Sequence, residues 1–191
     1  DLRTPLTRIK LLIAMIQDKV VADKLSRDVD EMEKMLNEYL QFARSGAKDK
    51  TETFDISLLI KNICDKYEKP NINYFLEDKI YFDGRKILIS RSISNLIDNS
   101  LKFANNVELH LKRGRSVINI SIEDDGPGIP QEEHQNVLKP FYKIDKSRSE
   151  TKSSVGLGLA ISSDVIKSHG GDLKFDKSSL GGLKVIISLP V

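Results

Sequence analysis

The stretch Glu123-Asp124-Asp125-Gly126-Pro127-Gly128-Ile129 directly follows residues 116–123, where apolar and polar side chains alternate as in a strand. Two glycines and a proline after a strand are typical of a tight turn. The same residues also suit a ligand, because glycine lets a ligand approach the backbone and a carboxylate accepts a hydrogen bond from an adenine amino group. This stretch alone leaves both interpretations open.

A second polar cluster, residues 95–103, lies on a helix that the pattern predicts over residues 84–104. Asn95, Asn99 and Lys102 are spaced i, i+4 and i+7, so they share one face of that helix. Amide oxygens suit a hydrated Mg²⁺ ion, and an ammonium group suits phosphate oxygens. A solvated polar face without a ligand explains the same spacing, and this alternative also stays open.

Two further clusters lie near the C-terminus. Gly156-Leu157-Gly158-Leu159-Ala160-Ile161 begins a helix predicted over about residues 156–169, and glycines there expose backbone N–H groups to a phosphate. Pro140-Phe141-Tyr142-Lys143 lies inside residues 131–154, whose polar composition predicts a mobile loop. Short glycine patterns are common, so the cluster at 156–161 indicates little by itself.

The rest of this half alternates short strands with helices. The pattern predicts a strand leading into a helix over residues 54–68, and strands at 72–77, 80–83, 107–112, 172–176 and 184–189. Gly181-Gly182 separates the last two strands. Such a mixture predicts an α/β sandwich in which helices cover one face of a mixed sheet.

Residues 1–48 have a different pattern, which predicts an antiparallel helical hairpin broken at Asp23-Lys24. Ser45–Lys50 reads as a linker that ends the second helix, so a second domain is expected over residues 52–191. Each helix has an apolar stripe spaced 4, 3, 4, 3, 4, formed by Leu2, Leu6, Ile9, Ile13, Ile16 and Val20, and by Leu25, Val29, Met32, Leu36, Tyr39 and Ala43.

A lone hairpin cannot bury both stripes, so pairing of two copies into a four-helix bundle is expected. The alternative is that the hairpin packs on the rest of its own chain. Pro5 either loosens the turn of residues 1–4 or marks a helix start capped by Thr4.

Composition restricts the class of protein. Hydrophobic residues at 39% and charged residues at 30% are typical of a soluble globular protein, and a net charge of +2 argues against nucleic-acid binding. Cys64 is the single cysteine of the sequence, which excludes an internal disulfide. Its apolar helical surroundings predict a buried structural thiol. No apolar stretch approaches the roughly 18 residues that a membrane span needs.

The four clusters, in this order and after a helical hairpin, resemble the N, G1, F and G2 boxes of the histidine kinases. That family shares an ATPase fold with gyrase, Hsp90 and MutL. Asp1-Leu2-Arg3-Thr4-Pro5-Leu6-Thr7 resembles the residues that directly follow the histidine of the family's H box. The resemblance covers essentially the whole chain. The residues of the H box and of Glu123 to Ile129 are most similar to those of the EnvZ-like osmosensors. It implies an α+β protein, with a dimeric four-helix bundle followed by the α/β sandwich.

The resemblance also implies ATP and Mg²⁺ as cofactors. Asn99 would be the Mg²⁺ ligand, assisted by Asn95, and Asp124 would bind the adenine amino group. The phosphates would contact Lys102, Lys143, Gly156 and Gly158. Packing around the nucleotide would come from the remaining residues of the boxes, Phe103, Gly126, Gly128, Ile129, Tyr142, Leu157 and Leu159.

In the family, a histidine on the first helix attacks the γ-phosphate of ATP and passes the phosphoryl group to an aspartate of a response-regulator receiver domain. Asp1 would orient that histidine, and Thr4 would hold a water for dephosphorylation of the regulator. The chain's three histidines, His110, His134 and His169, all lie beyond the hairpin. The acceptor is therefore expected directly before Asp1 in a longer parent, which the family places in the bacterial inner membrane with this part in the cytoplasm.

Two positions depart from the family pattern. Val155 stands where threonine is usual, and Ser154 where glycine is common, so a hydroxyl contact to phosphate is lost unless Ser153 or Ser154 replaces it. A degenerate kinase, acting as a nucleotide-binding dimerisation and regulator-docking module, is the alternative that this departure favours. A different ATPase of the superfamily is disfavoured by the hairpin.

Overall fold

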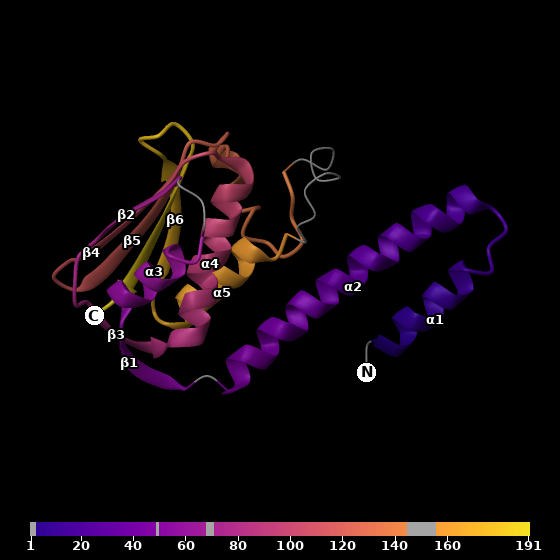
Figure 1. The fold of residues 1–191 in the computed structure, drawn as a ribbon, viewed down its shortest axis with the longest axis horizontal. Coiled ribbons are helices and arrows are strands. Elements are labelled where there is room, and N and C mark those ends of the chain that lie inside the picture. Colours follow the sequence, from indigo (N-terminus) through magenta and orange to yellow (C-terminus); the bar gives the residue numbers. More distant parts are fainter. Residues whose placement is uncertain (1–2, 49, 68–70, 145–155) are drawn as a thin grey trace. The chain divides into compact units, whose positions relative to one another are not determined.

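The structure is a computed structural model that describes residues 3–48, 50–67, 71–144 and 156–191 (Figure 1). The chain forms two compact units, Asp1–Arg44 and Ser45–Val191, and each is described by itself.

The first unit is a helical hairpin of α1 (Arg3–Ile13) and α2 (Lys19–Lys48). The turn lies at residues 14–18, so the predicted break at Asp23-Lys24 is wrong. The Asp18 carboxylate Oδ1 accepts hydrogen bonds from the backbone N–H groups of Val20 (2.9 Å) and Val21 (3.2 Å), and it thereby caps α2. The capping residue, rather than the polar pair, was the signal for the start of the helix. The predicted helix end at Ser45 is also wrong, because α2 continues to Lys48.

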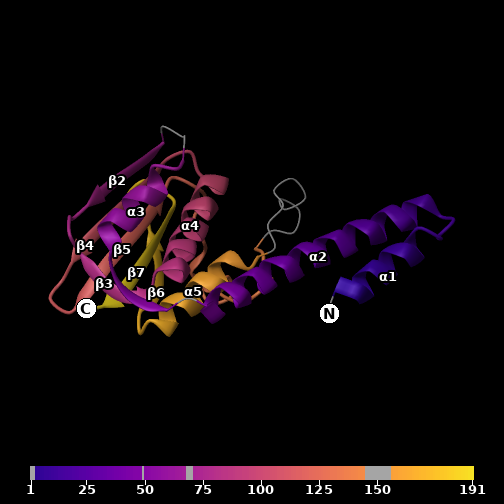
Figure 2. The same ribbon diagram turned by 60° about the horizontal axis from the view of Figure 1, so that its bottom comes forward.

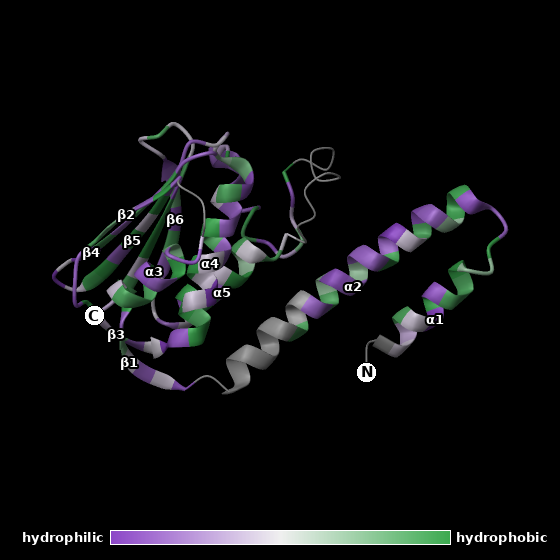
Figure 3. Ribbon diagram, viewed as in Figure 1, coloured by the Kyte–Doolittle hydropathy of each residue, from purple (hydrophilic) through white to green (hydrophobic). Residues whose placement is uncertain are grey.

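Only part of the two apolar stripes is buried within the hairpin. Leu6, Ile13 and Val29 form a small core, with Ile16, Ala22 and Leu36 packed against it. Other stripe residues, Ile9, Val20, Leu25 and Met32, remain exposed, and Figure 3 shows apolar residues along both helices. Lys10 joins the helices through ion pairs to Asp30 (2.8 Å) and Glu33 (2.7 Å), whose hydrogen bonds raise the pKa of its ammonium group.

The second unit contains a five-stranded mixed sheet of order β2-β4-β5-β7-β6. Strands β2 and β4 are parallel, and all other neighbours are antiparallel. The strands are β2 (Ile72–Leu76), β4 (Val107–Arg113), β5 (Val117–Asp124), β6 (Asp172–Lys177) and β7 (Leu183–Pro190).

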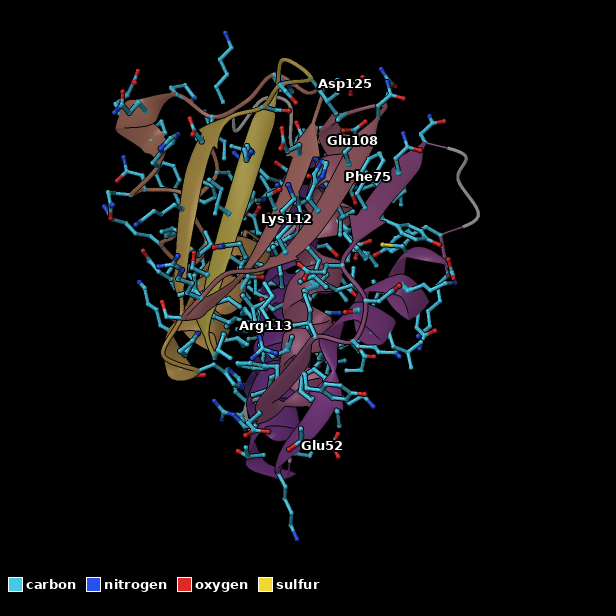
Figure 4. All side chains as sticks on the ribbon, turned by 90° about the vertical axis from the view of Figure 1, so that its left-hand side faces the viewer. Glu52, Phe75, Glu108, Lys112, Arg113 and Asp125 are labelled. Atoms are coloured by element: carbon cyan, nitrogen blue, oxygen red, sulfur yellow. The ribbon has the colours of Figure 1, made fainter. Side chains whose placement is uncertain are left out.

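Three helices cover one face of this sheet, α3 (Ile56–Cys64), α4 (Lys86–Phe103) and α5 (Gly158–Ser168) (Figures 1 and 2). Figure 4 looks onto the opposite, open face, where Phe75 of β2 and Glu108 and Lys112 of β4 are labelled. The predicted α/β sandwich, with helices on one face of a mixed sheet, is thus confirmed. A short 3₁₀ helix, Gln131–Glu133, begins the segment that was predicted as a polar loop.

Strands β1 (Thr51–Asp55) and β3 (Tyr81–Arg85) form a separate antiparallel pair, which the sequence did not distinguish from the main sheet. Asp55 ends β1 and caps α3, since its Oδ1 accepts from the backbone N–H of Leu58 at 3.1 Å. The rings of Phe54 and Phe82 meet edge to face between the two strands.

The core lies between the helices and the inner face of the sheet. It is rich in β-branched residues on the strands, because alternate positions of β4, β5 and β7 face inward. Its largest fully buried side chains include Ile56, Ile60, Ile89, Ile93, Leu96, Ile97, Leu109, Leu111, Ile118, Ile120 and Ile122. Cys64 is buried here, and burial raises the pKa of its thiol to about 11, as expected for a structural cysteine. Among the described helices, none combines the length and apolar character that crossing a bilayer requires.

Glu123, at the end of β5, is a buried carboxylate tied to the β6–β7 turn. Its Oε1 pairs with Lys184 Nζ at 2.8 Å, and its Oε2 accepts from the Ser179 N–H (3.1 Å) and hydroxyl (3.0 Å). Burial alone would raise the pKa of Glu123, but the bonds from Lys184 and Ser179 outweigh it and lower the pKa to about 2.

A carboxylate with a depressed pKa stabilises the fold above its unfolded pKa. That contribution is lost as the pH falls through the folded value. We therefore expect the free energy of unfolding to drop by up to about 3 kcal/mol between pH 4.5 and about 2, and Glu123→Gln to lack this component. Urea unfolding followed by circular dichroism measures it, since the chain has no tryptophan. Glu52→Gln, at an exposed glutamate of β1, should retain the wild-type pH profile. A Glu123→Gln profile that matches wild type would contradict this account.

Candidate functional site

The polar cluster on α4 faces away from the sheet. Ile93, Leu96 and Ile97 are fully buried against the core, whereas Asn95 and Asn99 on the same turns are only half-buried. A side chain at Gly158, the first residue of α5, would have its Cβ 3.9 Å from the Cβ of Asn95. The structure therefore brings the polar cluster at residues 95–103 and the glycine cluster at residues 156–161 together.

Within the described residues, no side-chain hydrogen bond caps the beginning of α5. Leu157 occupies the capping position and is buried, so the N–H groups of the first turn have no side-chain acceptor there. Gly156 precedes it with a φ of 76°, and a Cβ on Gly156 would lie 2.9 Å from the carbonyl oxygen of Tyr142. The Phe141 N–H donates to the carbonyl of Gly156 at 2.9 Å, so the main chain joins the aromatic cluster to the glycine cluster.

Asp124 ends β5 and is held by backbone donors. Its Oδ1 accepts from the N–H groups of Gly126 (3.0 Å) and Leu183 (2.9 Å), and its own carbonyl accepts from Gly182 N–H at 3.0 Å. A Cβ on Gly182 would overlap the Asp124 carboxylate, so only glycine allows this approach. A Cβ on Gly126 would lie 3.1 Å from the carbonyl oxygen of Phe103, which places the carboxylate beside the end of α4.

Asp125, the neighbouring carboxylate, has a structural role. It accepts from the backbone N–H groups of Asn105 (2.8 Å) and Asn106 (2.9 Å) and from the Asn106 side-chain amide (2.6 Å), which closes the turn between α4 and β4. The bonds from Asn106 and Asn105 lower the pKa of Asp125. Because the side-chain bonds of Asp125 within the described residues go to this turn, Asp124 rather than Asp125 remains the candidate for ligand binding.

The segment that follows Gly126-Pro127-Gly128 is held by bonds from His134 and from Tyr142. His134 Nε2 lies 3.1 Å from the carbonyl oxygen of Ile129, and its ring packs on Phe175 of β6. The Tyr142 hydroxyl donates to Glu133 Oε2 at 2.7 Å, and this bond raises the pKa of Tyr142. Gly128 has a φ of 71° and lies close to Gly182.

The remaining candidates are half-buried or exposed. Lys102 and Lys143 are half-buried, and Lys102 Nζ lies 5.2 Å from the centroid of the exposed Phe103 ring. Leu159 follows Gly158 in the first turn of α5. A contact that the sequence did not suggest is the hydrogen bond from the Tyr67 hydroxyl to Asp98 of α4, at 2.8 Å.

Some predicted residues are not part of this cluster. Thr4 is exposed on α1, in the first unit, while Asp1, Ser153, Ser154 and Val155 lie outside the described residues. The sequence also missed that Gly182 and Leu183 hold Asp124. The Gly181-Gly182 pair was the available signal, because a close backbone approach commonly requires glycine.

Two family models match the chain. Residues 84–191 match the histidine kinase-, DNA gyrase B-, and HSP90-like ATPases, and residues 1–48 match the His Kinase A (phospho-acceptor) domain. The chain belongs to the sensor histidine kinases. The predicted family is thereby confirmed, together with the helical hairpin and the ATPase-type fold.

This histidine kinase core is 30% identical to the sensor histidine kinase GtrS of Pseudomonas aeruginosa over 100% of the chain and 40% of that relative. It is 28% identical to the sensor histidine kinase CpxA of Escherichia coli K12, over 100% of the chain and 45% of the relative. The chain thus spans less than half the length of these curated relatives. The finer assignment to EnvZ-like osmosensors stays a prediction.

Solved structures agree with the fold. The mycobacterial sensor histidine kinase MprB superposes with a TM-score of 0.64 and 25% identity, over 74% of this chain and 97% of that one. Full-length ShkA in complex with AMPPNP has a TM-score of 0.70 at 20% identity, over 99% of this chain and 43% of that one, and shows likeness of fold alone.

Proposed function

We propose that this histidine kinase core binds ATP between α4, the end of β5 and the beginning of α5, and transfers its γ-phosphoryl group to a histidine. One observation carries the proposal: two clusters from elsewhere in the chain, one around Asp124 and Gly126 and one at Gly158, meet α4, which carries Asn95 and Asn99. Gly158 lies against Asn95, Gly126 lies against the end of α4 at Phe103, and Asp124 is held beside Gly126.

Each part of this arrangement suits one part of the nucleotide. Asp124 is oriented by two backbone donors on Oδ1, so the carboxylate is fixed before an adenine amino group donates to it. The uncapped first turn of α5, with Gly156 and Gly158, offers backbone N–H groups and the positive end of the helix dipole to the phosphates.

The donor set on α4 fits a magnesium ion that is shared with the substrate. Within the described residues, no three His, Cys, Asp or Glu side chains gather into a metal site. Mg²⁺ commonly takes one or two protein oxygens together with substrate phosphates and waters, so the Asn99 amide oxygen, assisted by Asn95, is sufficient. When bound, the ion would neutralise charge on the phosphates.

Loss of either end of the site should weaken nucleotide binding. Asn99→Ala removes the amide oxygen, and Asp124→Asn leaves an amide where the adenine amino group needs an acceptor. Each hydrogen bond to a charged group contributes about 1.5–3 kcal/mol, so we expect the Kd for Mg²⁺–ATP to rise about 10- to 100-fold in each variant. Isothermal titration calorimetry measures this change.

Asp78→Asn is the matched control, because Asp78 is an exposed aspartate in the loop between β2 and β3. Its affinity should equal that of the wild type. Thermal melts establish that all the variants are folded. Wild-type affinity in folded Asn99→Ala and Asp124→Asn would show that the site is assigned wrongly.

The phosphoryl group would pass to a histidine directly before Asp1, where the hairpin carries the H-box residues. Asp1 would orient the imidazole for attack, and the transfer itself needs mainly positioning and charge neutralisation. Thr4, exposed on α1, would hold the water that dephosphorylates the response regulator. An aspartate of that regulator's receiver domain would receive the phosphoryl group, and the parent would lie in the bacterial inner membrane.

A chain with a histidine placed directly before Asp1 tests the transfer. Incubation with γ-labelled ATP should place acid-labile label on the hairpin, because phosphohistidine hydrolyses in acid. The same chain with Asn99→Ala should take up little label. Normal ATP binding without label on the hairpin would instead indicate a nucleotide-binding and regulator-docking module.

The exposed half of the hairpin stripes supports a homodimer. Leu25 and Met32 flank the buried Val29 on one helix face, yet they are 39% and 52% exposed within a single chain. Pairing with a second hairpin would cover them in a four-helix bundle.

Light scattering at micromolar concentration should give twice the 21.6 kDa chain mass, and the double variant Leu25→Glu/Met32→Glu should give a monomer. Leu58→Glu/Ile87→Glu changes two similarly exposed apolar residues of the second unit and should stay dimeric. A monomeric wild type would reject the dimer.

A further inference from the structure

His169, at the end of α5, is bonded to two elements at once. The backbone N–H of Arg85 donates to His169 Nε2 at 3.0 Å, and His169 Nδ1 lies 2.7 Å from the carbonyl oxygen of Val165. Since Nε2 accepts, the proton of the neutral ring is on Nδ1, which donates to Val165. The ring thus joins the last turn of α5 to the residue that precedes α4.

The surroundings hold this ring in place. The Arg85 side chain donates to the Ser168 hydroxyl at 2.6 Å, and the ring of Phe82 packs beside the imidazole with centroids 6.0 Å apart. A Cβ on Gly84 would lie 3.0 Å from His169 Cδ2, so the absence of a side chain on β3 makes room for the imidazole.

Helices α4 and α5 run antiparallel and touch at three levels. At the C-terminal end of α5, His169 contacts Arg85. At the N-terminal end of α5, where the phosphates are expected, Gly158 lies next to Asn95. Between them, the fully buried Ser92 and Ser162 hydroxyls each donate to the backbone carbonyl of the other residue, at 3.4 and 3.2 Å.

The middle contact would be the pivot if α5 moved on α4. Ser162 lies about 6 Å along the helix from Gly158 and about 10 Å from His169, at 1.5 Å rise per residue. If the contact at His169 is lost, a rigid helix would tilt about the serine pair, and the Gly158 end would move by roughly 0.6 of the displacement at the far end. A small displacement of Gly158 would weaken the proposed contacts between the first turn of α5 and the phosphates, because such contacts depend on precise geometry.

We propose that His169 is a positioning residue, which sets the register of α5 on α4 and so aligns the phosphate-binding turn at Gly158 with Asn95. It acts through the helix and does not touch the nucleotide. The effect on ATP affinity rests on the ATP site proposed above. The positioning of α5 by His169 does not depend on that site.

His169→Ala should raise the Kd for Mg²⁺–ATP about tenfold and leave the Kd for adenosine nearly unchanged, because adenosine uses only the Asp124 end. His169→Gln, whose amide oxygen can reach the Arg85 N–H, should recover part of the lost ATP affinity. His110→Ala replaces a histidine on the open face of the sheet and should bind both ligands as the wild type does.

Hydrogen exchange without nucleotide provides an independent measurement. Exchange in the first turn of α5 should be faster in His169→Ala, while exchange in β5 is unchanged. An equal loss of ATP and adenosine affinity, or wild-type ATP affinity in a folded His169→Ala, would overturn the proposal. If the wild type itself binds no ATP, the function proposed above fails, and unchanged exchange in α5 would then overturn the positioning role as well.

Discussion

The burial of α4 against the sheet is the constraint on which the rest of the second unit depends. Ile89, Ile93, Leu96 and Ile97 are fully buried, and burying each such side chain contributes about 1.5–3 kcal/mol. That energy fixes the rotation of the helix about its axis. Because 3.6 residues make one turn, Asn95 and Asn99 must then point away from the sheet, toward the beginning of α5. The apolar face of α4 thus sets the direction of the polar face that we propose binds the nucleotide.

Three consecutive carboxylates at the end of β5 have three different partners. Glu123 is neutralised by Lys184 and anchors the β6–β7 turn, and Asp125 closes the α4–β4 turn. Asp124 lies between them, and its carboxylate is held by the backbone N–H groups of Gly126 and Leu183. Glu123 and Asp124 are neighbours in β5 and therefore face opposite sides of the sheet, whereas Asp125 lies beyond the end of the strand. Glu123 thereby stabilises the β6–β7 turn, which directly precedes the Leu183 N–H that orients Asp124.

Much of this architecture could be predicted from the sequence, because it depends on local patterns. The alternation in residues 116–123 and the apolar spacing of residues 84–104 predicted the strand and the helix that carry the proposed site, and the order of the clusters predicted the family. The hairpin turn was predicted wrongly, because the polar pair Asp23-Lys24 tolerates a helix and the cap at Asp18 was overlooked. Contacts between distant segments, such as Leu183 with Asp124 or Arg85 with His169, leave no periodic signal. They follow from strand register and helix packing, which only the assembled fold determines.

The way Asp124 is held has a consequence for how freely the chain can vary in evolution. Its carboxylate is oriented by main-chain N–H groups of Gly126 and Leu183, and every residue except proline supplies such a group. The side chain at position 183 can therefore change without loss of the bond, provided that it still fills the core. Gly182 has no such freedom, since any Cβ would displace the carboxylate. Around the proposed adenine site, the side chain at position 183 should therefore vary among related sequences, whereas the backbone conformation and Gly182 should not.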